Sequence, residues 1–136
     1  MTAYSGTPLP RKLGMKAPMT LVAIDAPREY RSWLGKLPAG VRIVAKAKPP
    51  VGAVHLFAKE RASLERHLAA LRGDLDQAGF VWVSWPKRAS GVETDITEDV
   101  VREAALPLGF VDVKVCAVSN VWSGLKLVIR KSGRTA

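Results

Sequence analysis

The sequence predicts a three-layer α/β fold, in which helices cover both faces of a mostly parallel sheet. Short apolar runs alternate with helical patterns through the middle of the chain, as expected for strand–helix–strand crossovers. Two alternating segments near the end have the pattern of an antiparallel hairpin with one exposed face. A length of 136 residues with 48% hydrophobic residues suits one domain with its own core.

The first part of the chain predicts an arm, a strand and a helix. Residues 1–18 are rich in glycine and proline, so we expect an extended arm with one turn around residues 9–13. The apolar run 19–24 predicts a buried strand. Pro27 suits the start of a helix whose apolar residues recur at helical spacing up to Leu37.

Three strands and one long helix follow. Residues 41–45 and 51–58 predict strands that are separated by a segment too short for another helix and strand. From Lys59 onwards the leucines recur at helical spacing through Leu75, which predicts the most regular helix. Residues 79–85 predict the next strand.

The last third predicts a capped helix and the hairpin. Asp95 and Glu98 have the spacing of a capping box, so we expect a helix that starts at Asp95 and ends at Pro107. Residues 111–118 and 125–130 alternate between apolar and polar side chains, which predicts two antiparallel strands. The predicted organisation is therefore an arm over 1–18, one α/β domain over 19–131 and a frayed tail over 132–136.

This order of elements resembles the class I methyltransferase-like variant of the Rossmann fold. The resemblance implies that one helix and one strand are missing between residues 45 and 51. In that family's strand labels the missing strand is number 3. The sheet order is then expected to be 2-1-4-5-7-6, with strands 6 and 7 forming the C-terminal hairpin.

Several strings of residues carry a second resemblance. They are residues 4–9, 12–14, 54–57, 82–87, 90–91, 94–100, 113–116 and 122–126. These strings resemble an uncharacterised bacterial family, a domain of unknown function with a small, degenerate methyltransferase-like domain. The resemblance covers nearly the whole chain and implies a fold, but it brings no activity that can be transferred.

The resemblance also indicates where S-adenosylmethionine would bind in an active methyltransferase. Such enzymes have a glycine-rich turn after the first strand and an acidic residue at the end of the second. Here residues 24–29 contain no glycine and residues 44–48 are basic. We therefore expect no cofactor and disfavour an active methyltransferase. Dinucleotide-binding and Walker-type glycine motifs are also absent from the sequence.

A ligand site is expected in the crevice at the carboxyl ends of the strands, where α/β folds place ligands. Its predicted residues combine cations with an aromatic wall: Asp25, Arg28, Lys59, Trp85, Lys87, Arg88 and Ser90. Such a rim suits a phosphate or a carboxylate. The alternative is that loop 85–91 is only a turn that orders the next helix. We expect no catalytic residue and no metal site, because His55 and His67 lie in different elements without nearby acids.

The charge of the chain is basic and uneven. The net charge is +9, and residues 1–50 carry nine basic side chains against two acidic ones. This excess attracts anionic small molecules, acidic protein surfaces or nucleic acid, although it also fits a merely solvated surface. Nucleic acid is not favoured, because zinc-finger spacings and RNP-like aromatic motifs are missing.

The location is predicted from three further features. No apolar run reaches the length of a membrane span, the N-terminus lacks a signal-type stretch, and Cys116 is the single cysteine. We therefore expect a cytoplasmic protein without a membrane contact.

The favoured function is a non-catalytic module that binds an anionic small molecule or an acidic protein surface through the strand-end crevice. One alternative is an enzyme with a noncanonical nucleotide-type cofactor in the same crevice, for which Asp25 and His55 are the candidate bases. Another is an accessory protein that binds nucleic acid. The sequence does not indicate the oligomeric state.

Overall fold

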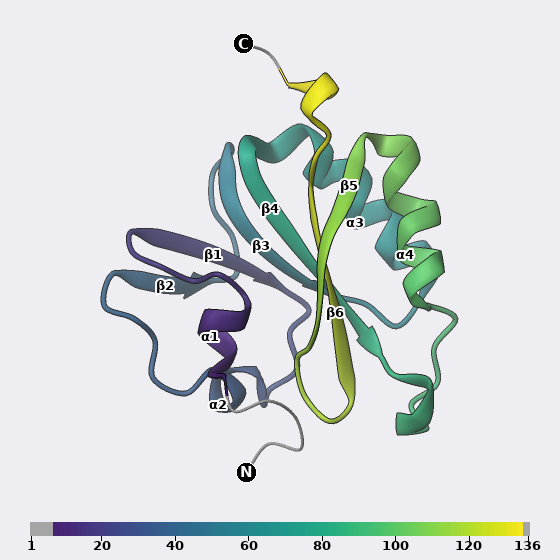
Figure 1. The fold of residues 1–136 in the computed structure, drawn as a ribbon, viewed down its shortest axis with the longest axis horizontal. Coiled ribbons are helices and arrows are strands. Elements are labelled where there is room, and N and C mark those ends of the chain that lie inside the picture. The colour runs from purple at the N-terminus through teal and green to yellow at the C-terminus, as the bar shows by residue number, and fades with distance from the viewer. Residues whose placement is uncertain (1–6, 135–136) are drawn as a thin grey trace.

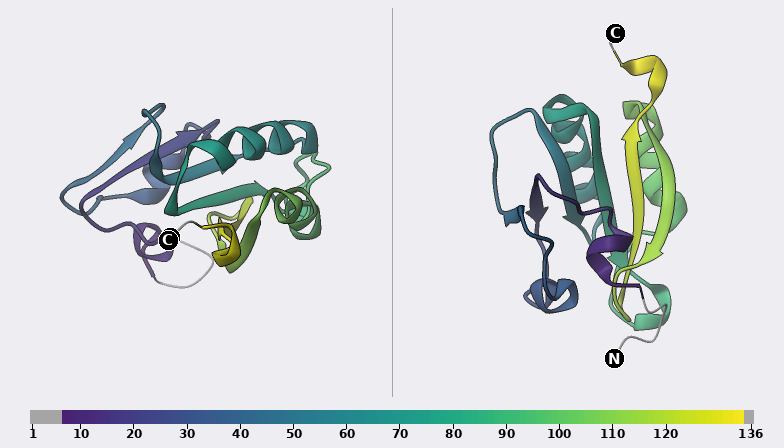
Figure 2. Two further views of the ribbon diagram at one scale, coloured as in Figure 1. Left: turned by 90° about the horizontal axis from the view of Figure 1, so that it is seen from above. Right: turned by 60° about the vertical axis from the view of Figure 1, so that its left-hand side comes forward.

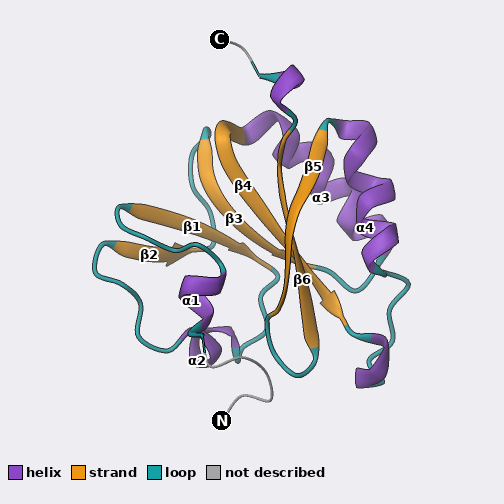
Figure 3. Ribbon diagram, in the orientation of Figure 1, coloured by secondary structure: helices purple, strands orange, loops and turns teal. Residues whose placement is uncertain are grey.

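A computed structural model describes residues 7–134 and contains a six-stranded sheet with helices on both faces (Figures 1 and 3). The helices and strands are α1 (Leu9–Lys12), β1 (Met19–Ile24), α2 (Tyr30–Leu34), β2 (Val41–Val44), β3 (Val51–Phe57), α3 (Arg61–Asp74), β4 (Leu75–Pro86), α4 (Glu98–Ala105), β5 (Phe110–Ala117) and β6 (Trp122–Ile129). Short 3₁₀ turns lie at Arg88–Ser90, Leu106–Leu108 and Lys131–Gly133. The parts of the predicted arm and tail that fall on residues 1–6 and 135–136 lie outside the described residues.

The strand order is β2-β1-β3-β4-β6-β5. Neighbours among β1 to β4 pair in parallel, whereas β6 is antiparallel to both β4 and β5. The predicted order 2-1-4-5-7-6 becomes this order once the unused label 3 is removed and the strands are counted along the chain. The predicted fold class is confirmed, and the carboxyl ends of β1 to β4 meet at one edge of the sheet.

One face of the sheet packs against α3 and α4. Leu64 and Leu68 of α3 and Val101 of α4 are fully buried against apolar side chains of β3, β4 and β6. The leucine spacing predicted this face of α3 correctly. This is the larger of the two hydrophobic clusters, so it supplies most of the apolar burial that stabilises the fold.

The other face is covered by the short helices α1 and α2 together with the segment that precedes β1 (Figure 2). Leu9, Leu13 and Met15 are buried against the sheet, and the indole nitrogen of Trp82 donates a hydrogen bond to the carbonyl of Leu13 over 2.9 Å. The turn expected around residues 9–13 is α1. The segment expected as an extended arm therefore contributes core residues to this face.

Two element boundaries differ from the prediction. Helix α2 spans only five residues, beginning at Tyr30 rather than near Pro27. Helix α3 ends at Asp74, and Leu75, which was expected on its apolar face, is the first residue of β4. Leu75 remains buried in the same cluster. The apolar pattern predicted that Leu75 is buried, but it could not distinguish the end of a helix from the start of a strand.

The capping box predicted at Asp95 is wrong. Thr97 is the N-cap of α4, and its hydroxyl accepts a hydrogen bond from the backbone N–H of Val100 over 3.2 Å. The Asp95 carboxylate instead accepts the backbone N–H of Arg61 over 2.7 Å, at the start of α3. Asp95 therefore caps a different helix, one that is distant in the sequence.

The hairpin is also longer and less regular than expected. Strand β6 begins at Trp122, and the register between β5 and β6 shifts between Asp112 and Lys114. Next to this shift, Asp112 accepts a hydrogen bond from Arg102 of α4 over 3.1 Å, and Val113 and Val115 are 55% and 51% exposed. The predicted frayed tail begins as the turn at Lys131–Gly133, after which Arg134 donates to the carbonyl of Ile129.

Candidate functional site

The structure brings part of the predicted strand-end site together. Trp85, Lys87 and Arg88 line one cavity of about 480 Å³ beyond the end of β4. Lys59 lines a neighbouring cavity of about 460 Å³, and the two cavities share Glu93 and Thr94. Asp25 and Arg28 line neither of them. The described geometry therefore groups three of the seven predicted residues and places Lys59 next to them.

The charge of this region is mixed rather than basic. Glu93 and Glu98 line the same cavity as Lys87 and Arg88, and Glu98 also bonds Arg102. These acids come from the segment that follows the predicted loop, so a count over residues 85–91 alone does not include them. An anion would meet two carboxylates here as well as two cations, which weakens the expected attraction.

Ser90 is engaged in the structure of its own turn. Its hydroxyl donates to the carbonyl of Lys87 over 2.6 Å and accepts the backbone N–H of Val92 over 3.2 Å. The hydroxyl of Thr94 donates to the carbonyl of Lys59 in the same way. This pattern favours the alternative that the loop orders the start of α4. The hydroxyl proton of Ser90 is already donated to the carbonyl of Lys87, so it is not available to a ligand.

Trp85 is 5% exposed and packs in the core with Ile96, so little of its ring faces a ligand. Asp25, by contrast, is exposed and has a φ of 56°. This backbone conformation is normally adopted by glycine, and aspartate is among the few other residues that tolerate it. The chain therefore makes a glycine-like turn after β1 without a glycine.

His55 lies in the middle of β3 and is fully buried. Its Nδ1 is 2.7 Å from the hydroxyl of Tyr30, and its Nε2 is 2.7 Å from Oγ of Ser84. A neutral imidazole has one donor and one acceptor nitrogen, so it satisfies both hydroxyls. Burial lowers the pKa of His55 to about 3 and raises the pKa of Tyr30. His55 is thus a neutral structural residue.

Aromatic rings extend this network toward the hairpin. The ring of His55 stacks on Phe57 at 4.2 Å between centroids, Tyr30 meets Phe57 edge-on at 5.1 Å, and Phe57 meets Trp122 at 5.2 Å. These contacts join α2, β3 and β6 into one packed cluster. The sequence gave no sign that Tyr30 and Ser84 would be the hydrogen-bond partners of His55.

The cysteine and the possible metal ligands give no support for a catalytic or metal site among the described residues. Burial raises the pKa of Cys116, and this effect exceeds the opposing influence of Lys12 and Lys114, so lysine does not activate the thiol. Within residues 7–134, no three His, Cys, Asp or Glu side chains gather into a group able to hold a metal ion. In the same residues, no helix is both long and apolar enough to cross a membrane.

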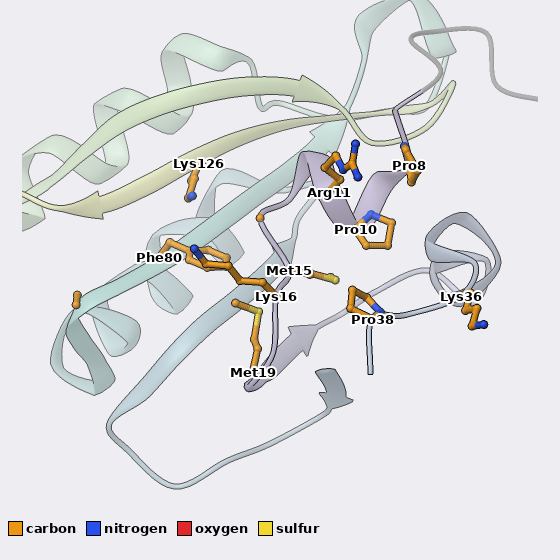
Figure 4. A pocket seen from close by; sticks show the side chains of 12 residues that line it. Pro8, Pro10, Arg11, Met15, Lys16, Met19, Lys36, Pro38, Phe80 and Lys126 are labelled. Atoms are coloured by element: carbon orange, nitrogen blue, oxygen red, sulfur yellow. The ribbon is translucent and has the colours of Figure 1, made fainter. Parts of the chain in front are cut away.

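A larger cleft lies on the face covered by α1 and α2 (Figure 4). Its volume is about 760 Å³, and it is lined by four cations: Arg11, Lys16, Lys36 and Lys126. None of its described lining residues is acidic. The remaining walls are largely apolar, with methionine, proline and phenylalanine side chains. We call this region the basic cleft.

The basic cleft was not predicted from the sequence. Its cations come from α1, from the segment before β1, from the loop after α2 and from β6, so they are far apart in the chain. The excess of charge in residues 1–50 was the available signal, and three of the four cations belong to it. Only the docking of α1 on the sheet brings them beside Lys126.

The arrangement of the sheet can be compared with solved structures. A SAM-dependent methyltransferase from Aquifex aeolicus is similar over 88% of this chain and 86% of its own, with a TM-score of 0.61 and 12% identity. A ribosomal protein L11 methylase from Lactobacillus delbrueckii subsp. bulgaricus matches over 90% and 74%, with a TM-score of 0.55 and 12% identity. This chain has the methyltransferase fold.

Longer structures match over part of their length. The chain covers 47% of TrmN from Thermus thermophilus, with a TM-score of 0.56 and 13% identity. No protein-family model matches the chain, and the search of curated proteins gave no match. At these identities the similarity establishes the fold alone, and membership of the uncharacterised bacterial family remains a prediction.

The residues at the cofactor position of this fold do not fit S-adenosylmethionine. The turn after β1 contains Pro27, and the carbonyl of Pro27 accepts the backbone N–H of Tyr30. Tyr30 then packs its ring onto His55 and Phe57 of β3, the strand beside β1. Strand β2 ends at Val44 and is followed by lysines instead of an acid. The glycine cradle and the ribose-binding acid are both missing.

Proposed function

We propose that this protein is a binding module on a methyltransferase fold, and that it recognises an anionic ligand without transferring a methyl group. The observation that carries the proposal is the basic cleft, where four cations line about 760 Å³ and no described lining residue is acidic. Small-molecule sites commonly enclose roughly 300–1,000 Å³, largely apolar, with a few polar groups that fix orientation. The cleft has these features, and its charge selects for anions.

The non-catalytic part of the proposal is supported by the residues available for chemistry. His55, one of the two candidate bases, is fully buried and bonded on both ring nitrogens. Asp25 is exposed and lines neither strand-end cavity. Calorimetry with S-adenosylmethionine tests this part directly. We expect no binding, and a micromolar or tighter dissociation constant overturns it.

The anion-binding part is tested by thermal shift with inorganic phosphate, nucleotides and carboxylates. We expect stabilisation of the native chain by at least one anion and a smaller stabilisation in Lys126→Gln. The matched control is Lys46→Gln, which removes an exposed cation that does not line the basic cleft. Equal stabilisation of both variants places the site elsewhere.

The strand-end site is a second candidate, because Lys87, Arg88 and Trp85 do line one cavity there. A double variant in which both Lys87 and Arg88 are replaced by alanine distinguishes the strand-end site from the basic cleft. If anion binding disappears in this double variant and persists in Lys126→Gln, the ligand lies beyond β4. A charge-assisted hydrogen bond contributes roughly 1.5–3 kcal/mol, so either loss is large enough to measure.

Nucleic acid remains an outcome of these tests rather than the proposal. Binding through several phosphates weakens steeply as salt concentration rises. A salt series with an oligonucleotide therefore distinguishes an extended basic surface from a cleft for one small anion. We likewise keep a cytoplasmic location as a proposal, which rests on the single cysteine, Cys116.

A further inference from the structure

One end of the basic cleft is a cluster of lysines around Phe80. The Nζ atom of Lys126 lies over the Phe80 ring, 4.7 Å from its centroid. Lys114 is the direct cross-strand neighbour of Lys126 in the β5–β6 pair. Lys16 approaches from the segment before β1, and its side chain extends toward Phe80 in Figure 4. Burial, and after it repulsion from Lys114 and Lys16, lowers the pKa of Lys126.

Within residues 7–134, none of Lys16, Lys114 and Lys126 forms an ion pair with a carboxylate. Arg61 and Arg102, on the opposite face of the sheet, are surrounded by carboxylates within 3.3 Å. At the basic cleft none of the described lining residues is acidic. Like charges that face one another cost free energy, and a bound anion removes that cost. The lysine end is therefore suited to one compact anionic group such as a phosphate.

The other end of the cleft carries a second pair of cations. Arg11 comes from α1 and Lys36 from the loop that follows α2, and Figure 4 draws both across the cavity from Lys126 and Phe80. Arginine is suited to phosphate and carboxylate groups because its planar donors match two oxygens at once. The cleft is thus lined by cations at two ends, with Lys126 at one and Arg11 and Lys36 at the other.

The wall between the two ends is apolar. Met15, Met19 and Pro38 line it, together with the ring of Phe80. The partly exposed side chain of Met19 can adapt to ligands of different shape, and the partly exposed ring of Phe80 offers a surface for stacking. The part of a ligand that lies against this wall would be bound more tightly if it were apolar than if it carried further charge.

Resting on the proposed function, we propose that the ligand has two anionic groups joined by an apolar or aromatic body. The Lys126 end binds one group, the Arg11 end binds the other, and the body lies against Phe80 and the methionines. The class includes bisphosphates and dicarboxylates that carry a hydrophobic linker. A ligand with one anionic group is expected to use only half of the site.

The test compares matched pairs of probes by calorimetry at fixed salt. The pairs are hexyl phosphate with 1,6-hexanediol bisphosphate, and adenosine 5′-monophosphate with adenosine 3′,5′-bisphosphate. We expect the bisphosphate of at least one pair to bind about tenfold or more tightly than its monophosphate, the size of one added charge-assisted contact. Lys126→Gln and Arg11→Gln should each reduce bisphosphate affinity to the monophosphate level, and Lys46→Gln should leave it unchanged.

The possible failures are distinguishable. If the monophosphates bind and depend on Lys126, but the bisphosphates bind no more tightly, the two-ended ligand is wrong and the anion site stands. If all three variants weaken the bisphosphate equally, the effect is one of total charge, and the inference is overturned. If neither these phosphates nor the carboxylates of the thermal-shift series bind the folded wild type, the proposed function itself is wrong. If a carboxylate binds and the phosphates do not, the inference of a bisphosphate-like ligand is overturned and the anion site stands. Circular dichroism confirms that each variant is folded before it is compared.

Discussion

Replacing His55 with glutamine tests the reasoning about the buried network. Burial lowers the pKa of His55 from 6.5 to about 3, so the folded protein does not take up a proton that the unfolded chain binds readily. Below pH 6.5 the unfolded state holds more protons than the native state. Stability must therefore fall as the pH is lowered from about 6.5 toward 3.

The magnitude follows from the size of the shift. One unit of pKa corresponds to about 1.4 kcal/mol, so at pH 4.5, two units below the ordinary value, His55 costs on the order of 3 kcal/mol of stability. That is a large share of the roughly 5–15 kcal/mol by which domains are stable. The other ionisable groups are common to wild type and variant, so their contributions cancel in the difference between the two proteins.

The assay is urea unfolding of wild type and His55→Gln at pH 7.5, 6.5, 5.5 and 4.5. Glutamine keeps a donor and an acceptor but loses the ring that stacks on Phe57, so we expect the variant to be less stable at neutral pH. Because glutamine does not titrate, the variant should also be less sensitive to acid. We expect the difference between the two free energies of unfolding to shrink by on the order of 3 kcal/mol between pH 7.5 and 4.5. A difference that stays constant across this range refutes the buried, neutral assignment of His55.

Three other predictions concern stability. Leu68→Ala should lower the free energy of unfolding by about 2–5 kcal/mol in chemical denaturation, because Leu68 is fully buried between α3 and the sheet. A loss below about 1 kcal/mol would mean that the buried face of α3 is wrongly assigned. Asp95→Ala should cost about 0.5–2 kcal/mol by removing the cap of α3, whereas Asp95→Asn should recover much of it. Lys126→Met should raise the melting temperature at neutral pH, and this gain should shrink as the pH rises toward 10.5, because a lysine with a lowered pKa destabilises the fold only while it is charged. A melting temperature that is unchanged at every pH contradicts the last of these.

The sheet was predictable because periodicity and connection length constrain it strongly. Runs such as residues 19–24 and 79–85 cannot be amphipathic helices, and a helix between parallel strands leaves one handedness for the crossover. The boundaries were less predictable. Leu75 satisfies the apolar pattern of both α3 and β4, and Asp95 caps a helix that starts 34 residues before it. Neither choice can be made without the contacts that only the folded chain provides.

The site was predicted only in part, for a related reason. The rule that α/β folds bind ligands at strand ends led to Lys87 and Arg88, which do lie in one cavity. The same rule does not anticipate Glu93 and Glu98, nor a cleft built from α1 and the hairpin. Such a cleft depends on where a short N-terminal segment docks, and that is decided by a few contacts such as the hydrogen bond from Trp82 to the carbonyl of Leu13.

The basic cleft differs from the rest of the described protein because its charged groups repel one another. Among the described residues, every buried side-chain polar atom has a hydrogen-bond partner, and even the histidine in the middle of the sheet is satisfied on both nitrogens. Local choices in a natural sequence usually agree with the fold, and departures concentrate where function requires them. A half-buried lysine held between two other lysines is such a departure, since a neutral side chain on β6 would be more stable. The same arrangement that costs stability in the empty protein is the one that binds an anion, which is why Lys126→Met is expected to gain stability and lose the ligand together.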